Sequence, residues 1–60
     1  MKKIKKEKYL DKKFIRNGNI YKVFDVDLAT ETLSFRNLEK PELVTRETIK
    51  KFDDNYTEVK

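Results

Sequence analysis

The sequence predicts an all-β fold of five short strands behind a basic leader, on three observations. Its 60 residues suffice for one domain only, because a chain of this length cannot be divided into two cores. Apolar and polar residues alternate in short runs, which is the period of a half-buried strand. Turn-forming residues separate these runs. We therefore expect a leader over residues 1–8, flexible or a frayed helix, and one folded unit over residues 9–60.

The clearest local signal is a hairpin centred on Asn17 and Gly18. This pair lies between two strand-like segments, 13–16 and 19–23, and supplies the two positive φ angles of a type I′ turn. A two-residue loop sets the register of the pairing, and directly paired side chains share a face of the ribbon. The residues expected to face the core are Leu10, Phe14, Tyr21 and Val23.

Beyond Val23 the apolar positions shift by one residue. Phe24, Val26 and Leu28 take the parity opposite to that of the preceding apolar residues. A phase change within a continuous strand is typical of a β-bulge, which bends the strand and increases its twist. We expect a bulge here, beyond which these three residues face the core.

The rest of the chain carries three more strand-like segments. Leu33 and Phe35 alternate with polar neighbours and are expected to share the core face. The single proline, Pro41, cannot donate to a ladder and marks a turn. The expected strands cover residues 32–38, 42–47 and 56–59, with turns at 29–31 and 39–41.

One short helical turn is expected before the last strand. Ile49 and Phe52 are apolar and three residues apart, and Thr48 before them is a capping residue. The spacing favours a single turn of the tight kind, ended by the polar residues 53–55. The order of five strands with this turn predicts an SH3-like small barrel, in which a bent sheet encloses one core. An OB-fold, and a β-hairpin packed on a helical leader, are the alternatives.

Composition argues against catalysis. The chain has no cysteine and no histidine, so it lacks a thiolate nucleophile, the usual general base and the commonest metal ligand. Asp25 and Asp27 could suggest a calcium loop, but Ala29 and Arg36 stand where oxygen ligands belong. We expect no enzyme activity, no cofactor and no metal.

The net charge of +4 is unevenly distributed. Residues 1–13 carry +5 and residues 14–60 carry −1, so the excess belongs to the leader and the body is not a basic platform. No apolar run is long enough for a membrane span or a signal peptide. A soluble, cytoplasmic protein without a membrane partner is expected.

Several segments together resemble a known group of proteins. The resembling segments are 13–23, 26–27, 33–35, 44–47 and 52–59. They are similar to small SH3-like proteins of phages and mobile elements of Gram-positive bacteria, and the resemblance extends over residues 10–59. It implies an SH3-like fold and a bacterial host cell as the location, but no site residues.

Two functions are predicted. The first is a non-enzymatic accessory factor that binds or inhibits a host protein, such as a nuclease or a defence component, by steric and electrostatic contact. Its expected contact residues are Asn17, Gly18, Asp25, Asp27, Asp53 and Asp54.

The alternative is a nucleic-acid-binding protein that uses the barrel surface and a polycationic leader. Its expected phosphate contacts are Lys2, Lys3, Lys5 and Lys6. Both a monomer and an edge-paired homodimer are compatible with this pattern.

Overall fold

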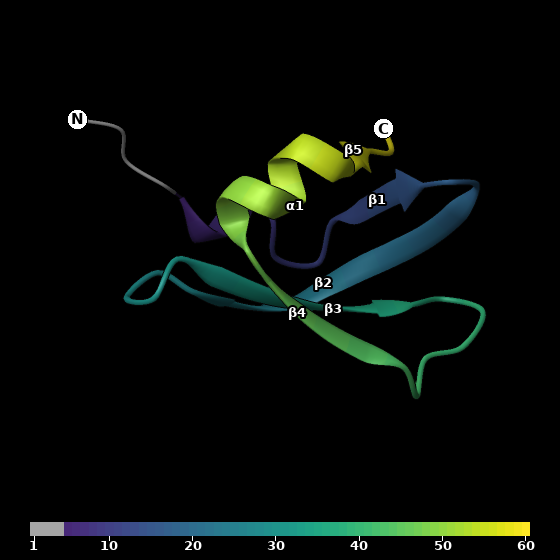
Figure 1. Cartoon of the computed structure of the whole chain (residues 1–60), viewed down its shortest axis with the longest axis horizontal. Coiled ribbons are helices and arrows are strands. Elements are labelled where there is room, and N and C mark those ends of the chain that lie inside the picture. Colours follow the sequence, from purple (N-terminus) through teal and green to yellow (C-terminus); the bar gives the residue numbers. More distant parts are fainter. Residues whose placement is uncertain (1–4) are drawn as a thin grey trace.

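The computed structural model describes residues 5–60 and contains five antiparallel strands and one α-helix (Figure 1). A 3₁₀ turn, η1, precedes the strands, and the strands form one sheet in the order β4-β3-β2-β1-β5. The elements are η1 (Lys6–Lys8), β1 (Lys13–Arg16), β2 (Asn19–Asp27), β3 (Thr32–Asn37), β4 (Val44–Thr48), α1 (Ile49–Asn55) and β5 (Thr57–Glu58). The predicted five-stranded, mostly β architecture is confirmed.

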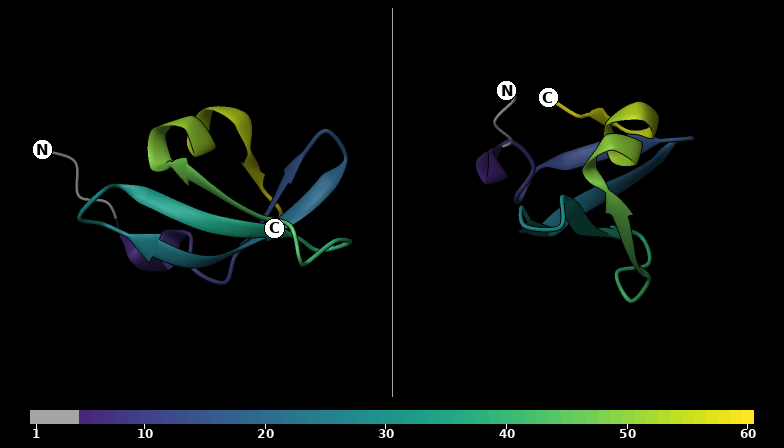
Figure 2. Two further views of the ribbon diagram at one scale, coloured as in Figure 1. Left: turned by 60° about the horizontal axis from the view of Figure 1, so that its bottom comes forward. Right: turned by 60° about the vertical axis from the view of Figure 1, so that its left-hand side comes forward.

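The sheet is open, which differs from the closed barrel expected from the sequence. β4 and β5 form its two edges, and closure would require a ladder between them. β5 contributes only two residues, both paired with β1, so it offers little ladder for closure. The chain instead places α1 against one face of the twisted sheet (Figures 1 and 2). A short helix thus provides the second layer that buries the core.

The first hairpin has the predicted geometry. Asn17 and Gly18 have φ angles of 51° and 78°, as a type I′ turn requires. The register pairs Phe14 with Tyr21 and continues to Arg16 opposite Asn19. The Asn-Gly pair therefore determines both the turn and the register of β1 with β2.

The bulge is also confirmed, and the register shifts between Val23 and Asp25. Val26 beyond it is buried, as predicted. Phe24 and Leu28, however, are 37% and 43% exposed and do not join the core. Phe24 is the extra residue of the bulge and has no partner on β3, so the alternation of side chains does not direct it into the core.

The helix is longer than predicted. Residues 49–55 form an α-helix, and the Thr48 hydroxyl accepts a hydrogen bond from the Lys51 amide at 3.3 Å. The cap was predicted correctly, but the tight single turn was not, because a spacing of three residues suits both helix types. Asp53, Asp54 and Asn55 continue the helix instead of ending it. β4 begins at Val44, two residues later than expected.

The core lies between α1 and the sheet and is dominated by aromatic rings. Phe52 of α1 is fully buried, with its ring centroid 4.7 Å from Phe14, 5.0 Å from Phe35 and 4.5 Å from Tyr56. The buried hydrophobic residues of the core are Tyr9, Phe14, Val23, Val26, Leu33, Phe35, Ile49 and Phe52, and Leu10, Tyr21 and Tyr56 pack against them. Every aromatic residue of the chain except Phe24 belongs to this network.

Within residues 5–60, neither helical element has the length and apolar character needed to cross a bilayer.

Candidate functional site

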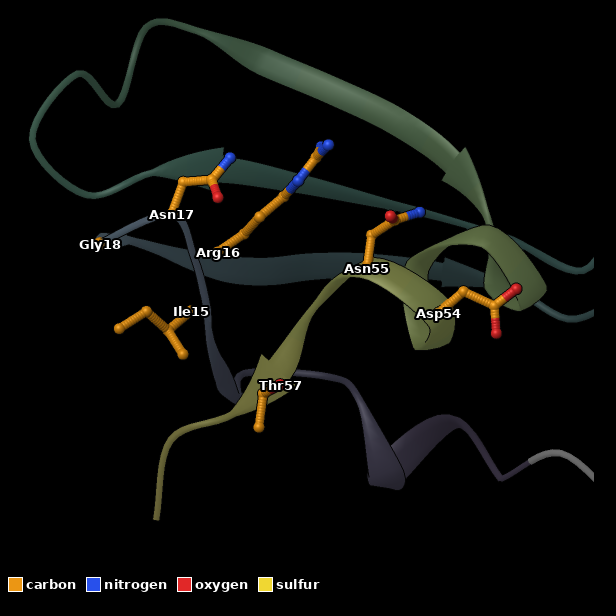
Figure 3. Close-up of a pocket in the computed structure, with 7 residues that line it drawn as sticks. All are labelled: Ile15, Arg16, Asn17, Gly18, Asp54, Asn55 and Thr57. Carbon is orange, nitrogen blue, oxygen red and sulfur yellow. The ribbon is translucent and has the colours of Figure 1, made fainter.

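An open hollow of about 530 Å³ lies between the first hairpin turn and the C-terminal end of α1 (Figure 3). Three elements meet there: the end of β1 with its turn, the last residues of α1, and β5. The lining residues are Ile15, Arg16, Asn17, Gly18, Asp54, Asn55 and Thr57. Asn17, Gly18 and Asp54, three of the predicted contact residues, are thus brought together from segments far apart in the sequence.

Arg16 and Asn55 on the rim are held by neighbouring groups. The Arg16 guanidinium lies 5.4 Å from the centre of the Tyr56 ring and donates to its hydroxyl at 3.5 Å. The Asn55 side-chain amide donates to the Lys51 carbonyl at 2.9 Å. These contacts restrain Arg16 and Asn55 before any partner binds, which lowers the entropy cost of ordering these two side chains on association.

Asp54 is the free carboxylate of the hollow. It is exposed, and no other residue among 5–60 forms a hydrogen bond or ion pair with its side chain. Asp53 differs, since both of its carboxylate oxygens accept from the Tyr9 hydroxyl, at 3.0 and 2.9 Å. Burial, with the hydrogen bond to Asp53 and its negative charge, raises the pKa of Tyr9 to about 12. Asp53 therefore stabilises the fold, and Asp54 is the better contact residue.

Asp27 also has a structural role. Its Oδ1 accepts from the backbone amides of Ala29 and Thr30, at 3.0 and 3.3 Å, in the turn that follows β2. Arg46 lies 3.6 Å from its Oδ2. The hydrogen bond from Thr30, followed by that from Ala29 and the charge of Arg46, lowers the pKa of Asp27. This carboxylate orders the β2–β3 turn.

The remaining predicted residues do not join the hollow. Asp25 is exposed on β2, opposite Ser34 of β3. Lys5 and Lys6 are exposed at the start of the described chain, while Lys2 and Lys3 lie outside the described residues. The acidic contacts predicted from the sequence therefore do not form one patch.

The hollow is lined mainly by side chains that can form hydrogen bonds. It presents one guanidinium, one carboxylate and two side-chain amides, with the aliphatic side chain of Ile15 at its border. In the described chain, no three histidine, cysteine, aspartate or glutamate side chains gather to hold a metal ion. The groups present donate and accept hydrogen bonds.

One cluster was missed by the sequence interpretation. Lys13 lies directly opposite Lys22, and Lys22 lies directly opposite Arg36 on the next strand. The division of charge at residue 13 concealed this row, because it counted Lys13 with the leader and balanced Lys22 and Arg36 against acidic residues elsewhere in 14–60. The predicted hairpin register already implied the first of these two pairs.

No protein-family model, curated protein or solved structure matches this chain, so the interpretation of both surfaces depends on their own geometry.

Proposed function

We propose that this protein is a non-enzymatic binding module that docks on another protein through the hollow between the β1–β2 turn and α1. The observation that carries the proposal is the meeting of Asn17, Gly18 and Asp54 with Arg16 around one partly apolar depression. Charges of both signs, amide groups and aliphatic surface are together typical of a protein interface. A nucleic-acid backbone would be repelled by Asp54.

The proposed fold relationship is to SH3-like small barrels. It is supported by the strand order, in which β1 to β4 form a meander and the chain returns through α1 to place β5 beside β1. The bulge in β2 supports it as well, because it bends the longest strand. The open edge between β4 and β5 is the departure from a closed barrel.

The proposed partner is a protein of a bacterial host, and the proposed effect is steric occlusion of that protein. Its origin in a phage or mobile element rests on the resemblance of residues 10–59. A nuclease or defence component with a basic groove would suit Asp54, while Asn17 and Asn55 would supply hydrogen bonds. No reacting group is required for this mechanism.

Affinity capture from bacterial lysate with matched charge variants tests the proposal. Asp54→Lys should lower recovery of a stoichiometric partner about tenfold or more, since it reverses a charge at the centre of the interface. Asp25→Lys makes the same charge change at an exposed site outside the hollow and should retain the partner.

A photoreactive side chain placed at Thr57 should crosslink to the captured partner. The same group at Thr45, exposed on β4 and outside the hollow, should not. Equal capture by the two lysine variants, or crosslinking from position 45 only, would show that the hollow is not the interface.

A further inference from the structure

The sheet face opposite α1 carries two parallel rows of side chains. One row is cationic, with Arg36 of β3, Lys22 of β2 and Lys13 of β1 directly opposite one another. These residues alternate with Phe35, Val23 and Phe14, which are buried against α1, so the cations lie on the other face. The row crosses three adjacent strands.

The second row is apolar and lies beside the first. Ile15 pairs with Ile20, and Leu38 donates its backbone amide to the Ile20 carbonyl at 3.0 Å. Ile15, Ile20 and Leu38 are 38%, 37% and 40% exposed. Aliphatic surface and positive charge therefore run side by side over β1, β2 and the end of β3.

The cationic row is unfavourable for folding. Like charges directly opposite each other on neighbouring strands destabilise a sheet, and this row contains two such contacts in succession. No acidic side chain of the described chain pairs with Lys13, Lys22 or Arg36. Asp25 lies further along β2, and Asp27 pairs with Arg46. A binding role for the row would explain an arrangement that costs stability.

We propose that this outer face binds single-stranded nucleic acid, with phosphates on the cationic row and bases on the adjoining apolar and aromatic surface. The cationic row lies outside the hollow, whose lining contains none of its three residues, and Ile15 of the adjoining apolar row lies at the border of the two surfaces. Adjacent strands are about 4.8 Å apart, so the row presents its charges along a line about 10 Å long. Consecutive phosphates can therefore engage it.

Phe24 and Arg36 favour a single strand over a duplex. The Arg36 guanidinium lies 4.4 Å from the centre of the Phe24 ring, and Phe24 is the aromatic residue that the core leaves out. Unstacked bases stack on aromatic rings and on guanidinium planes. A duplex keeps its bases stacked inside and would gain little from Phe24, Ile15 or Ile20.

The binding test uses the full chain with labelled oligothymidylate and oligouridylate of about 20 nucleotides. Replacing Lys13, Lys22 and Arg36 by Gln should lower the affinity at about 50 mM salt by about tenfold or more. The slope of log affinity against log salt should also fall by about 2, because each phosphate contact to a single strand contributes about 0.7. The control replaces Lys50, Lys51 and Lys60, three exposed lysines elsewhere, by Gln and should bind as the parent protein does.

Two further variants separate the contributions of the face. Phe24→Ala should weaken single-strand binding about fivefold without changing the salt slope, because it removes stacking and no charge. Replacing Lys2, Lys3, Lys5 and Lys6 by Gln should lower the slope of log affinity against log salt less than the substitutions on the outer face do. A thermal melt of the triple outer-face variant should be no lower than that of the parent, because its substitutions remove repulsion.

The proposal is overturned if the parent chain does not bind the oligonucleotides, or if the outer-face and control triple variants bind equally. It is also overturned if a duplex of the same length, or vesicles of anionic phospholipid, bind more tightly than the single strands. Loss of binding in the leader variant, with the outer-face variant unaffected, would assign the activity to the leader instead. None of these outcomes bears on protein docking at the hollow.

Discussion

Tyr9 anchors the segment before β1 to the core. Its ring is 3% exposed and stacks at 6.1 Å on Phe14, while its hydroxyl donates to Asp53 at the far end of the chain. Tyr9 was not among the residues that the sequence predicted to face the core. Its partner is 44 residues away, and no local pattern indicates such a contact.

The burial of Tyr9 and its hydrogen bond to Asp53 predict a pH dependence of stability. The folded-state pKa of about 12 exceeds the ordinary value of 10.0, so the native state retains this proton longer than the unfolded state. The stabilisation is complete below about pH 10 and is lost as the pH rises from 10 to 12.

Tyr9→Phe should lower the free energy of unfolding at neutral pH by about 1 kcal/mol. It should also reduce the loss of stability between pH 10 and 12, because the variant has no hydroxyl to ionise. Urea unfolding at a series of pH values measures this free energy. Tyr21→Phe removes a hydroxyl that has no side-chain hydrogen bond among residues 5–60 and is the control. An unchanged alkaline decline in Tyr9→Phe would contradict the assignment.

At the scale of the elements, α1 depends on its cap and the sheet depends on its cross-strand pairs. The cap at Thr48 could be predicted from the sequence because it is a local signal. The like-charge row of Lys13, Lys22 and Arg36 depends on two strand pairings, β1 with β2 and β2 with β3. The sequence predicted the register of the first pairing only. Local sequence signals therefore predicted the individual elements better than the surfaces that several elements form together.

Thr48→Ala should destabilise the protein by about 1 kcal/mol, because the Lys51 amide loses its acceptor. Thr48→Ser keeps the hydroxyl and should cost much less. Urea denaturation monitored by circular dichroism measures both variants. Equal losses for the two would assign the effect to packing of the threonine methyl group.

Lys22→Glu should stabilise the protein, because it places a carboxylate between Lys13 and Arg36. The expected gain is about 0.2–1 kcal/mol for each of the two relieved contacts, smaller at high salt. The same variant should lose nucleic-acid binding. A lower urea midpoint than that of the parent would contradict the description of the row as repulsive.

For the molecule as a whole, stability rests on a small aromatic core. A chain of 60 residues has a stability of about 3–9 kcal/mol at the usual 0.05–0.15 kcal/mol per residue. Phe52 is fully buried, and its ring contacts come from β1, β3 and the segment before β5. One side chain thus holds together elements that are otherwise far apart in sequence.

Phe52→Ala should cost about 3–5 kcal/mol, which is comparable with the whole stability, so much of the population should be unfolded at 37 °C. Phe24→Ala removes the same group at an exposed position and should cost less than about 1 kcal/mol. Circular dichroism and urea titration compare the two. Similar losses would contradict the placement of the core under α1.

Local sequence patterns specify the strands, the Asn17-Gly18 turn, the first register, the bulge after Val23 and the cap at Thr48. Each of these follows from residues close together in the chain, through turn geometry or alternation.

Three features emerge only in the folded chain: the open sheet, the contacts that engage Asp53 and Asp27, and the row of Lys13, Lys22 and Arg36. These features depend on contacts between distant segments. Such contacts are selected by how the aromatic core packs, and a one-dimensional pattern does not encode that packing directly.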